Sequence, residues 1–89
     1  MTEKVTLSSL AVGEGMTVSY IGGEEAMRQR LYDIGVVENT YIRCVMISPL
    51  GDPKAYVIRG AVIALRGNDA CNIVGYKDIG RSPNKEAGQ

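Results

Sequence analysis

The feature that most constrains this chain is a pair of prolines placed directly before a β-hairpin pattern, within residues 48–70. Pro49 and Pro53 have no backbone N–H to donate to a sheet, and each favours an extended conformation in the residue before it. The residues between them, 50–52, must therefore form a tight and restrained loop. We expect this loop to be rigid and to position the strand that follows it.

The loop leads into two strands, 54–58 and 61–65, which are separated by Arg59 and Gly60. A two-residue turn fixes the register of a hairpin, because the residues pair outward from the turn. The predicted pairs are Ile58 with Ala61, Tyr56 with Ile63, and Lys54 with Leu65. Side chains alternate along a strand, so one face carries most of the bulk. That face comprises Tyr56, Ile58, Ala61, Ile63 and Leu65.

Three further segments have the alternation or the β-branched residues of strands, and they lie at residues 16–21, 40–48 and 70–76. Alternation places Met16, Val18 and Tyr20 on one face of the first segment, opposite Thr17, Ser19 and Ile21. In the second segment Ile42, Cys44 and Met46 share one face and Tyr41, Arg43, Val45 and Ile47 the other, so its second half is apolar on both sides. Before them, Leu7 and Leu10 are three positions apart, which indicates a helical turn that pins both leucines to the core. Residues 67–69 are predicted to form a turn.

One short helix is predicted after the first of these strands. Glu24 and Glu25 suit the positive end of a helix dipole, and strong helix formers follow at residues 26–34. Gly35 can adopt the left-handed conformation that ends a helix. Helical spacing places Met27, Leu31 and Ile34 on the inner face and Arg28, Gln29, Tyr32 and Asp33 on the outer face.

The length of 89 residues allows one domain, and 45% of these residues are hydrophobic, without tryptophan or phenylalanine. The core must therefore be small and largely aliphatic. We place the domain at residues 1–76 and expect a flexible polar tail at 77–89.

Charge and hydropathy limit the partners of this chain. Ten basic residues balance ten acidic residues, so the field that attracts nucleic acid is missing. The longest apolar run, residues 61–65, is far below the roughly 20 residues of a membrane helix. Residues 1–4 lack the apolar segment of a signal peptide. We therefore expect a cytoplasmic protein that neither binds nucleic acid nor inserts into a membrane.

The residues needed for catalysis or for a common metal site are missing from the pattern. There is no histidine, and the two cysteines, Cys44 and Cys71, are not in a Cys-x-x-Cys spacing. Cys44 lies in an apolar strand and is expected in the core, whereas Cys71 could be exposed. No carboxylate pair or nucleophile with a base is evident. We expect a protein that is not an enzyme and has no cofactor.

Five short strands with a helix inserted after the first predict a mostly β fold, a small SH3-like and partly open barrel. Such a sheet leaves unpaired edge strands. Self-association of the chain through such an edge is therefore an open alternative.

These segments, in this order and at this spacing, resemble the FeoA family, the small cytosolic proteins of bacterial ferrous iron uptake. The shared elements are Arg-Leu-x-x-x-Gly at residues 30–35, Pro-Leu-Gly-Asp-Pro at 49–53 and Leu-Arg-x-x-x-Ala at 65–70. The resemblance extends over residues 7–73, nearly all of the predicted domain.

The resemblance implies an SH3-like barrel and an accessory role, without catalysis, for the membrane GTPase transporter FeoB. Asn39 and Gly75 depart from the pattern, since the family usually has a glycine and a strand valine there, but both are compatible with the fold. The same domain type forms the C-terminus of iron-dependent repressors of the DtxR kind. The alternative is therefore a stand-alone metal- or ligand-sensing regulatory module.

Two surfaces are candidates for partner contact. One is the outer face of the helix, with Arg28 and Tyr32. The other is the proline-bounded loop, with Leu50, Gly51, Asp52 and Pro53. A restrained loop loses little entropy on docking, and an exposed Leu50 would give it an apolar anchor. A packed core position for Leu50 is an equal alternative.

Arg66 is expected to pair with Asp52 or Asp69 rather than with a partner.

An intrinsic site for ferrous iron is not expected. Glu24 with Glu25, or Asp33 with Glu38, could offer only surface carboxylates without supporting contacts. The first pair is better explained by its place at the start of the helix. Stoichiometric, micromolar binding in an anaerobic titration with ferrous ion would contradict this prediction.

Overall fold

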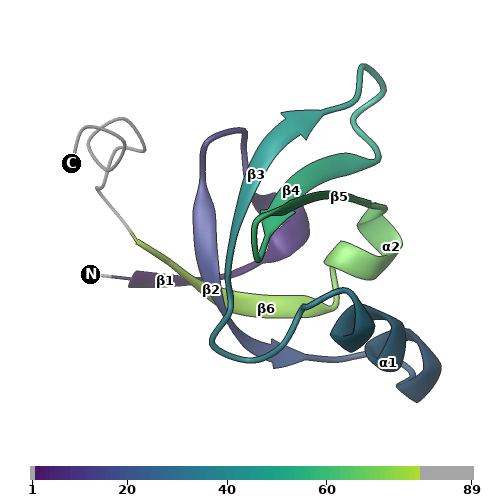
Figure 1. Ribbon diagram of the computed structural model, residues 1–89. Coiled ribbons are helices and arrows are strands. Elements are labelled where there is room, and N and C mark those ends of the chain that lie inside the picture. The colour runs from purple at the N-terminus through teal and green to yellow at the C-terminus, as the bar shows by residue number, and fades with distance from the viewer. Residues whose placement is uncertain (1, 79–89) are drawn as a thin grey trace.

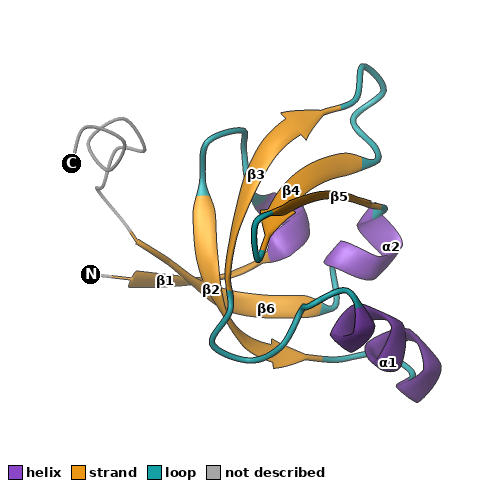
Figure 2. Cartoon of the chain, in the orientation of Figure 1, coloured by secondary structure: helices purple, strands orange, loops and turns teal. Residues whose placement is uncertain are grey.

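The computed structural model of the chain describes residues 2–78. Its elements are β1 (Thr2–Thr6), the 3-10 helical turn η1 (Leu7–Ser9), β2 (Gly15–Ile21), α1 (Glu25–Asp33), β3 (Tyr41–Ile47), β4 (Lys54–Ile58), β5 (Ala61–Leu65), α2 (Gly67–Ala70) and β6 (Ile73–Asp78). The strands form one antiparallel sheet in the order β1-β6-β2-β3-β4-β5 (Figure 1). Figure 2 shows α1 and α2 together at one side of this curled sheet. The predicted mostly β architecture with one inserted helix is confirmed.

The sheet has one strand more than the five that the sequence pattern predicts. β1 is short and polar, and it forms a strand because β6 offers it an edge, with Thr2 opposite Asp78. Lys77 and Asp78 therefore belong to β6, and the predicted start of the tail at residue 77 is too early. The rest of the predicted tail, residues 79–89, lies outside the described residues.

The β4–β5 hairpin has the predicted register in all three predicted pairs. Arg59 and Gly60 form its turn with φ values of 51° and 86°. Positive φ at both central residues is typical of the type I′ turn, whose twist matches that of the flanking strands. The two turn residues are therefore sufficient to fix the register of β4 with β5.

Two irregularities in the sheet turn side chains away from the faces that alternation predicts. The pairing of β2 with β6 shifts between Val18 and Tyr20, so Tyr20 is 62% exposed while Ile21 is buried. The pairing of β3 with β4 shifts between Cys44 and Met46, and Met46 is 60% exposed. The predicted grouping of Tyr20 with Met16 and Val18, and of Met46 with Ile42 and Cys44, is therefore wrong, because an extra residue in one strand reverses the alternation beyond it.

The C-terminus of α1 has the predicted glycine. Gly35 has a φ of 103°; its N–H donates to the carbonyl of Tyr32 at 3.0 Å, and the N–H of Val36 donates to that of Leu31 at 2.9 Å. These are the two bonds of a Schellman motif, which satisfies the last carbonyls of the helix. Ile34, predicted on the inner face, is 37% exposed because it is the cap residue, beyond the last helical turn.

The core lies inside the curl of the sheet and includes both leucines around η1, as predicted. Its buried side chains are Leu7, Leu10, Met16, Val18, Ile21, Leu31, Val36, Ile42, Cys44, Tyr56, Ile58, Leu65, Ala70 and Ile73. Tyr56 is the largest of them, and its hydroxyl donates to the carbonyl of Leu7 at 3.4 Å. Burial raises the pKa of Tyr56 to about 12.

The segment after β5 differs from the sequence prediction in one detail. Residues 67–69 begin the short helix α2, which ends at Ala70, so β6 starts at Ile73 rather than at residue 70. In the described part of the chain, no helix has the length and apolar character needed to span a lipid bilayer.

Candidate functional site

The loop between β3 and β4 is held by its own backbone. The N–H of Gly51 donates to the carbonyl of Ser48 at 2.8 Å, and the N–H of Ser48 donates to the carbonyl of Pro53 at 3.2 Å. The first bond closes a β-turn with Pro49 and Leu50 at its centre, a position where proline is favoured. Gly51 follows with a φ of 90°, which glycine adopts without strain. The loop is thus a restrained turn, as the two prolines predict.

Leu50 occupies the tip of this loop, and 94% of its surface is exposed. Figure 1 shows the loop projecting away from the body of the sheet. The alternative of a core position for Leu50 is therefore wrong. An exposed leucine on a restrained turn is an apolar group that a partner could cover at a small entropic cost.

Asp52 has a structural role at the base of the same loop. One of its carboxylate oxygens accepts a hydrogen bond of 2.7 Å from the N–H of Gly67, the first residue of α2. The other lies 3.9 Å from the guanidinium of Arg66. The predicted pair of Arg66 with Asp52 is confirmed, whereas Asp69 lies 3.8 Å from Arg30 and connects α2 to α1. Asp52 therefore fastens the loop to the start of α2, and half-buried Pro53 leads directly into β4.

The two candidate residues on α1 are only partly exposed. Arg28 and Tyr32 are both half-buried, and Tyr32 packs against the hydrophobic core rather than lying wholly on the outer surface. Its hydroxyl donates to the carboxylate of Glu38 at 3.4 Å. Figure 1 shows α1 and the β3–β4 loop at opposite ends of the molecule. The six predicted contact residues therefore form two separate surfaces.

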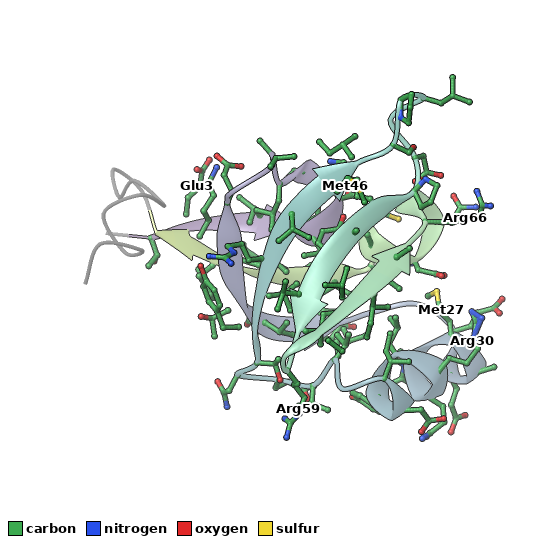
Figure 3. All side chains as sticks on the ribbon, turned by 45° about the horizontal axis from the view of Figure 1, so that its top comes forward. Glu3, Met27, Arg30, Met46, Arg59 and Arg66 are labelled. Carbon is green, nitrogen blue, oxygen red and sulfur yellow. The ribbon has the colours of Figure 1, made fainter. Side chains whose placement is uncertain are left out.

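Sequence reasoning missed apolar side chains that share one end of the molecule with Leu50. Val12 and Met46 are 56% and 60% exposed, and Ile47 is 36% exposed. Hydrogen bonds from Gly13 to Cys44 and from Cys44 to Glu14, of 2.8 and 2.9 Å, hold the turn of Val12 beside β3. Figure 3 shows Met46 at this end of β3. We call Val12, Met46, Ile47 and Leu50 the apolar end.

A charged group lies next to the apolar end. The carboxylate of Glu14 accepts a hydrogen bond from the N–H of Ala11 at 2.8 Å and one from Lys77 at 3.3 Å. The bond from Ala11, followed by the interactions with Lys77 and Lys54, lowers the pKa of Glu14. This carboxylate is therefore ionised and already paired in the folded chain.

Lys54 is directed into the protein instead of towards a ligand. Its ammonium donates to the carbonyls of Ser8 and Leu10, at 2.6 and 3.0 Å. Cys44 is buried as predicted, and burial raises the pKa of its thiol, whereas Cys71 is exposed; both cysteines are free. Within residues 2–78, no three acidic, cysteine or histidine side chains converge on a common point.

Known proteins share both the sequence pattern and the fold of this chain. The family model of the FeoA domain matches residues 5–76. The solution structure of the FeoA protein from Chlorobium tepidum is 33% identical and superposes with a TM-score of 0.74, over 80% of this chain and 69% of that chain. The crystal structure of Stenotrophomonas maltophilia FeoA complexed with zinc, described as an SH3 domain protein, is 28% identical, with a TM-score of 0.68 over 83% and 89%.

A more distant likeness extends to a transcription factor. A manganese-dependent transcriptional repressor has a TM-score of 0.77 over 88% of this chain and 44% of its own, at 18% identity, which shows a shared fold alone. No curated protein matches the sequence. The family model covers most of the chain and the sheet is of the SH3-like kind, so this chain belongs to the FeoA family.

Proposed function

We propose that this protein is a non-catalytic accessory protein of bacterial ferrous iron uptake, which acts in the cytoplasm by docking on the GTPase part of FeoB and modulating Fe(II) transport. Membership of the FeoA family supports this proposal. So does the description of the Stenotrophomonas maltophilia protein as a candidate ferrous iron transport activating factor. The balanced charge and the absence of histidine favour binding over chemistry.

The observation that carries the docking proposal is the exposure of Leu50, at 94%, on a turn held by two hydrogen bonds. Covering a leucine side chain contributes about 1.5–3 kcal/mol to binding, and a preformed turn avoids most of the ordering cost. Val12 and Met46 are further exposed apolar side chains at the same end of the molecule.

The test is a pull-down and calorimetric titration of the cytoplasmic domain of FeoB with Leu50→Ser. We expect binding to weaken by at least ~10-fold, since the anchor of the contact is lost. Tyr20→Ser is the matched control, because Tyr20 is also exposed but lies in β2, outside the apolar end. A double variant of Leu50 and Tyr32 that folds and binds unchanged would remove both residues from the site.

The effect on transport requires its own measurement. GTP hydrolysis by FeoB and iron uptake, each with and without this protein, show whether it activates or inhibits the transporter. No change in either quantity would contradict the accessory role. The prediction that the chain has no intrinsic site for ferrous ion stands beside it, with anaerobic titration as its test.

The fold shared with the repressor favours a second candidate function. In this alternative the chain is a stand-alone metal- or ligand-sensing module that acts on a regulator supplied by another protein. The neighbouring genes distinguish the two functions. A gene for a large membrane GTPase favours the accessory role, and a gene for a helix-turn-helix repressor favours the regulatory module.

A further inference from the structure

The strand β5 forms one edge of the sheet and is entirely apolar. It pairs with β4 on one side, and its sequence is Ala-Val-Ile-Ala-Leu. Val62 is 67% exposed and Ala64 is also exposed. An edge strand without charge, proline or bulge is a ready template for another strand.

The hairpin geometry identifies the backbone groups that face outward. In an antiparallel pair joined by a two-residue turn, the residues that flank the turn exchange hydrogen bonds, and alternate residues point their N–H and C=O away from the partner. Since Ala61 pairs with Ile58 next to the turn, the outward residues are Val62 and Ala64. In the part of the chain that the structure describes, nothing bonds to these outward groups.

Positive charges mark both ends of this edge. Figure 3 shows Arg59 and Arg66 at opposite ends of β5, each pointing away from the sheet. The side chain of Arg66 is 73% exposed and its pair with Asp52 is long, at 3.9 Å. The Asp52 carboxylate also accepts a hydrogen bond from Gly67, and its pair with the exposed Arg66 is weak. The guanidinium of Arg66 is therefore available to pair with a carboxylate of a partner.

The charges disfavour a second copy of this chain on β5. A symmetric pair of β5 strands must be antiparallel, and the longest such pairing is centred on Ile63. It would place Arg66 opposite Gly60 of the other copy and next to its Arg59, twice across the interface. Like charges in these positions repel. A segment with acidic ends meets the same charges favourably.

We propose that β5 binds an extended segment of a partner protein as an added strand, and that this segment has an uncharged, β-branched middle and an acidic residue at each end. Main-chain hydrogen bonds to Val62 and Ala64 would hold the segment, and Arg59 and Arg66 would select its ends. The inference deepens the proposed function by giving the docking mode, and it rests on that function only for the partner's identity.

The test uses a synthetic peptide of about eight residues, alternating valine and threonine with a glutamate at each end. The peptide is titrated into the isotope-labelled full chain, and amide shifts are followed by NMR. We expect the largest shifts at Val62 and Ala64. Ala64→Pro should weaken binding about 10-fold, because proline removes one outward N–H and leaves the bonds to β4 intact.

Two controls keep the result interpretable. Ala64→Ser retains the N–H and should bind like the parent chain. The double variant Arg59→Glu with Arg66→Glu should prefer a lysine-ended peptide over the glutamate-ended one, reversing the parent's selectivity. Equal binding by a folded Ala64→Pro variant, or no shift at Val62 and Ala64 at millimolar peptide, would overturn the proposal.

The FeoB domain separates this inference from the proposed function. If FeoB binds the parent chain and Ala64→Pro equally, the β5 inference is wrong and the accessory role stands. If FeoB does not bind but the peptide does, the accessory role fails and the strand-binding edge stands.

Discussion

The two edges of the sheet differ in their attachment and in their chemistry. β1 pairs with β6, from the other end of the described chain, and it exposes Thr2 and the charged side chains of Glu3 and Lys4. β5 pairs with β4, its neighbour across a two-residue turn, and it exposes only apolar side chains.

Because of this difference, we expect the β1 edge to contribute mainly to the stability of the fold and the β5 edge mainly to binding of a partner. The charged side chains of β1 discourage pairing with a further strand. β1 itself forms only when it pairs with β6, which is far from it in sequence. The apolar edge is set by local geometry and leaves its outward backbone groups available. We therefore expect substitutions beside β1 to affect folding most, and substitutions in β5 to affect association most.

The largest effect is expected for Gly75→Ala in β6. Gly75 pairs with Val5 of β1 and Val18 of β2, and a Cβ there would overlap the carbonyl oxygen of Thr17. The obstacle is backbone, so relief requires a shift of β2. We expect a loss of about 3 kcal/mol in the free energy of unfolding, measured by urea denaturation.

Gly67→Ala is the matched control for this substitution. Its added Cβ would meet only Asp52 Oδ1, at 3.4 Å, so the change in stability should stay within about 0.5 kcal/mol. Equal effects of the two substitutions would show that the close approach of β2 to β6 is unimportant.

A smaller effect is expected for Gly60→Ala in the turn before β5. A Cβ at Gly60 would meet nothing within 4 Å, but the φ of 86° is unfavourable for alanine. The cost should be about 1 kcal/mol, from the backbone alone. If Gly60→Ala proves more destabilising than Gly75→Ala in the same denaturation experiment, the ranking of the two edges is reversed.

The pH dependence tests the charged side of the sheet, where Glu14 binds Lys77 of β6. The folded-state pKa of Glu14 is lowered, so its contribution is present above the unfolded pKa near 4.5 and is lost as pH falls through the lower folded value. Glu14→Gln should cost at most about 1 kcal/mol at pH 7 and flatten the stability profile below pH 4.5. An unchanged slope of stability against pH in this acidic range would exclude the contribution.

The smallest effect on stability is expected for Ala64→Lys in β5. The side chain is exposed, so the free energy of unfolding should change by less than about 0.5 kcal/mol. Aggregation at high concentration should slow, because a lysine on an edge strand opposes strand addition. Light scattering measures this, and aggregation of the variant as fast as that of the parent chain would show that the β5 edge does not drive association.

The sequence by itself determined the parts of this protein that depend on neighbouring residues. The β4–β5 register follows from two turn residues, and the end of α1 follows from Gly35, because both are set by local backbone preferences. The family also follows from short motifs at fixed spacing. The restrained β3–β4 loop likewise follows from Pro49 and Pro53.

Only the tertiary structure decided the features that depend on distant pairing. β1 is too short and polar to be recognised until β6 lies beside it, and the two register shifts that expose Tyr20 and Met46 arise between strands rather than within one. The exposure of Leu50 and the hydrogen bond from Gly67 to Asp52 also depend on the positions of β3 and α2 in the folded chain. The candidate contact residues and the two elements that carry them could be named from the sequence, but the placement of these elements at opposite ends of the molecule required the packed sheet.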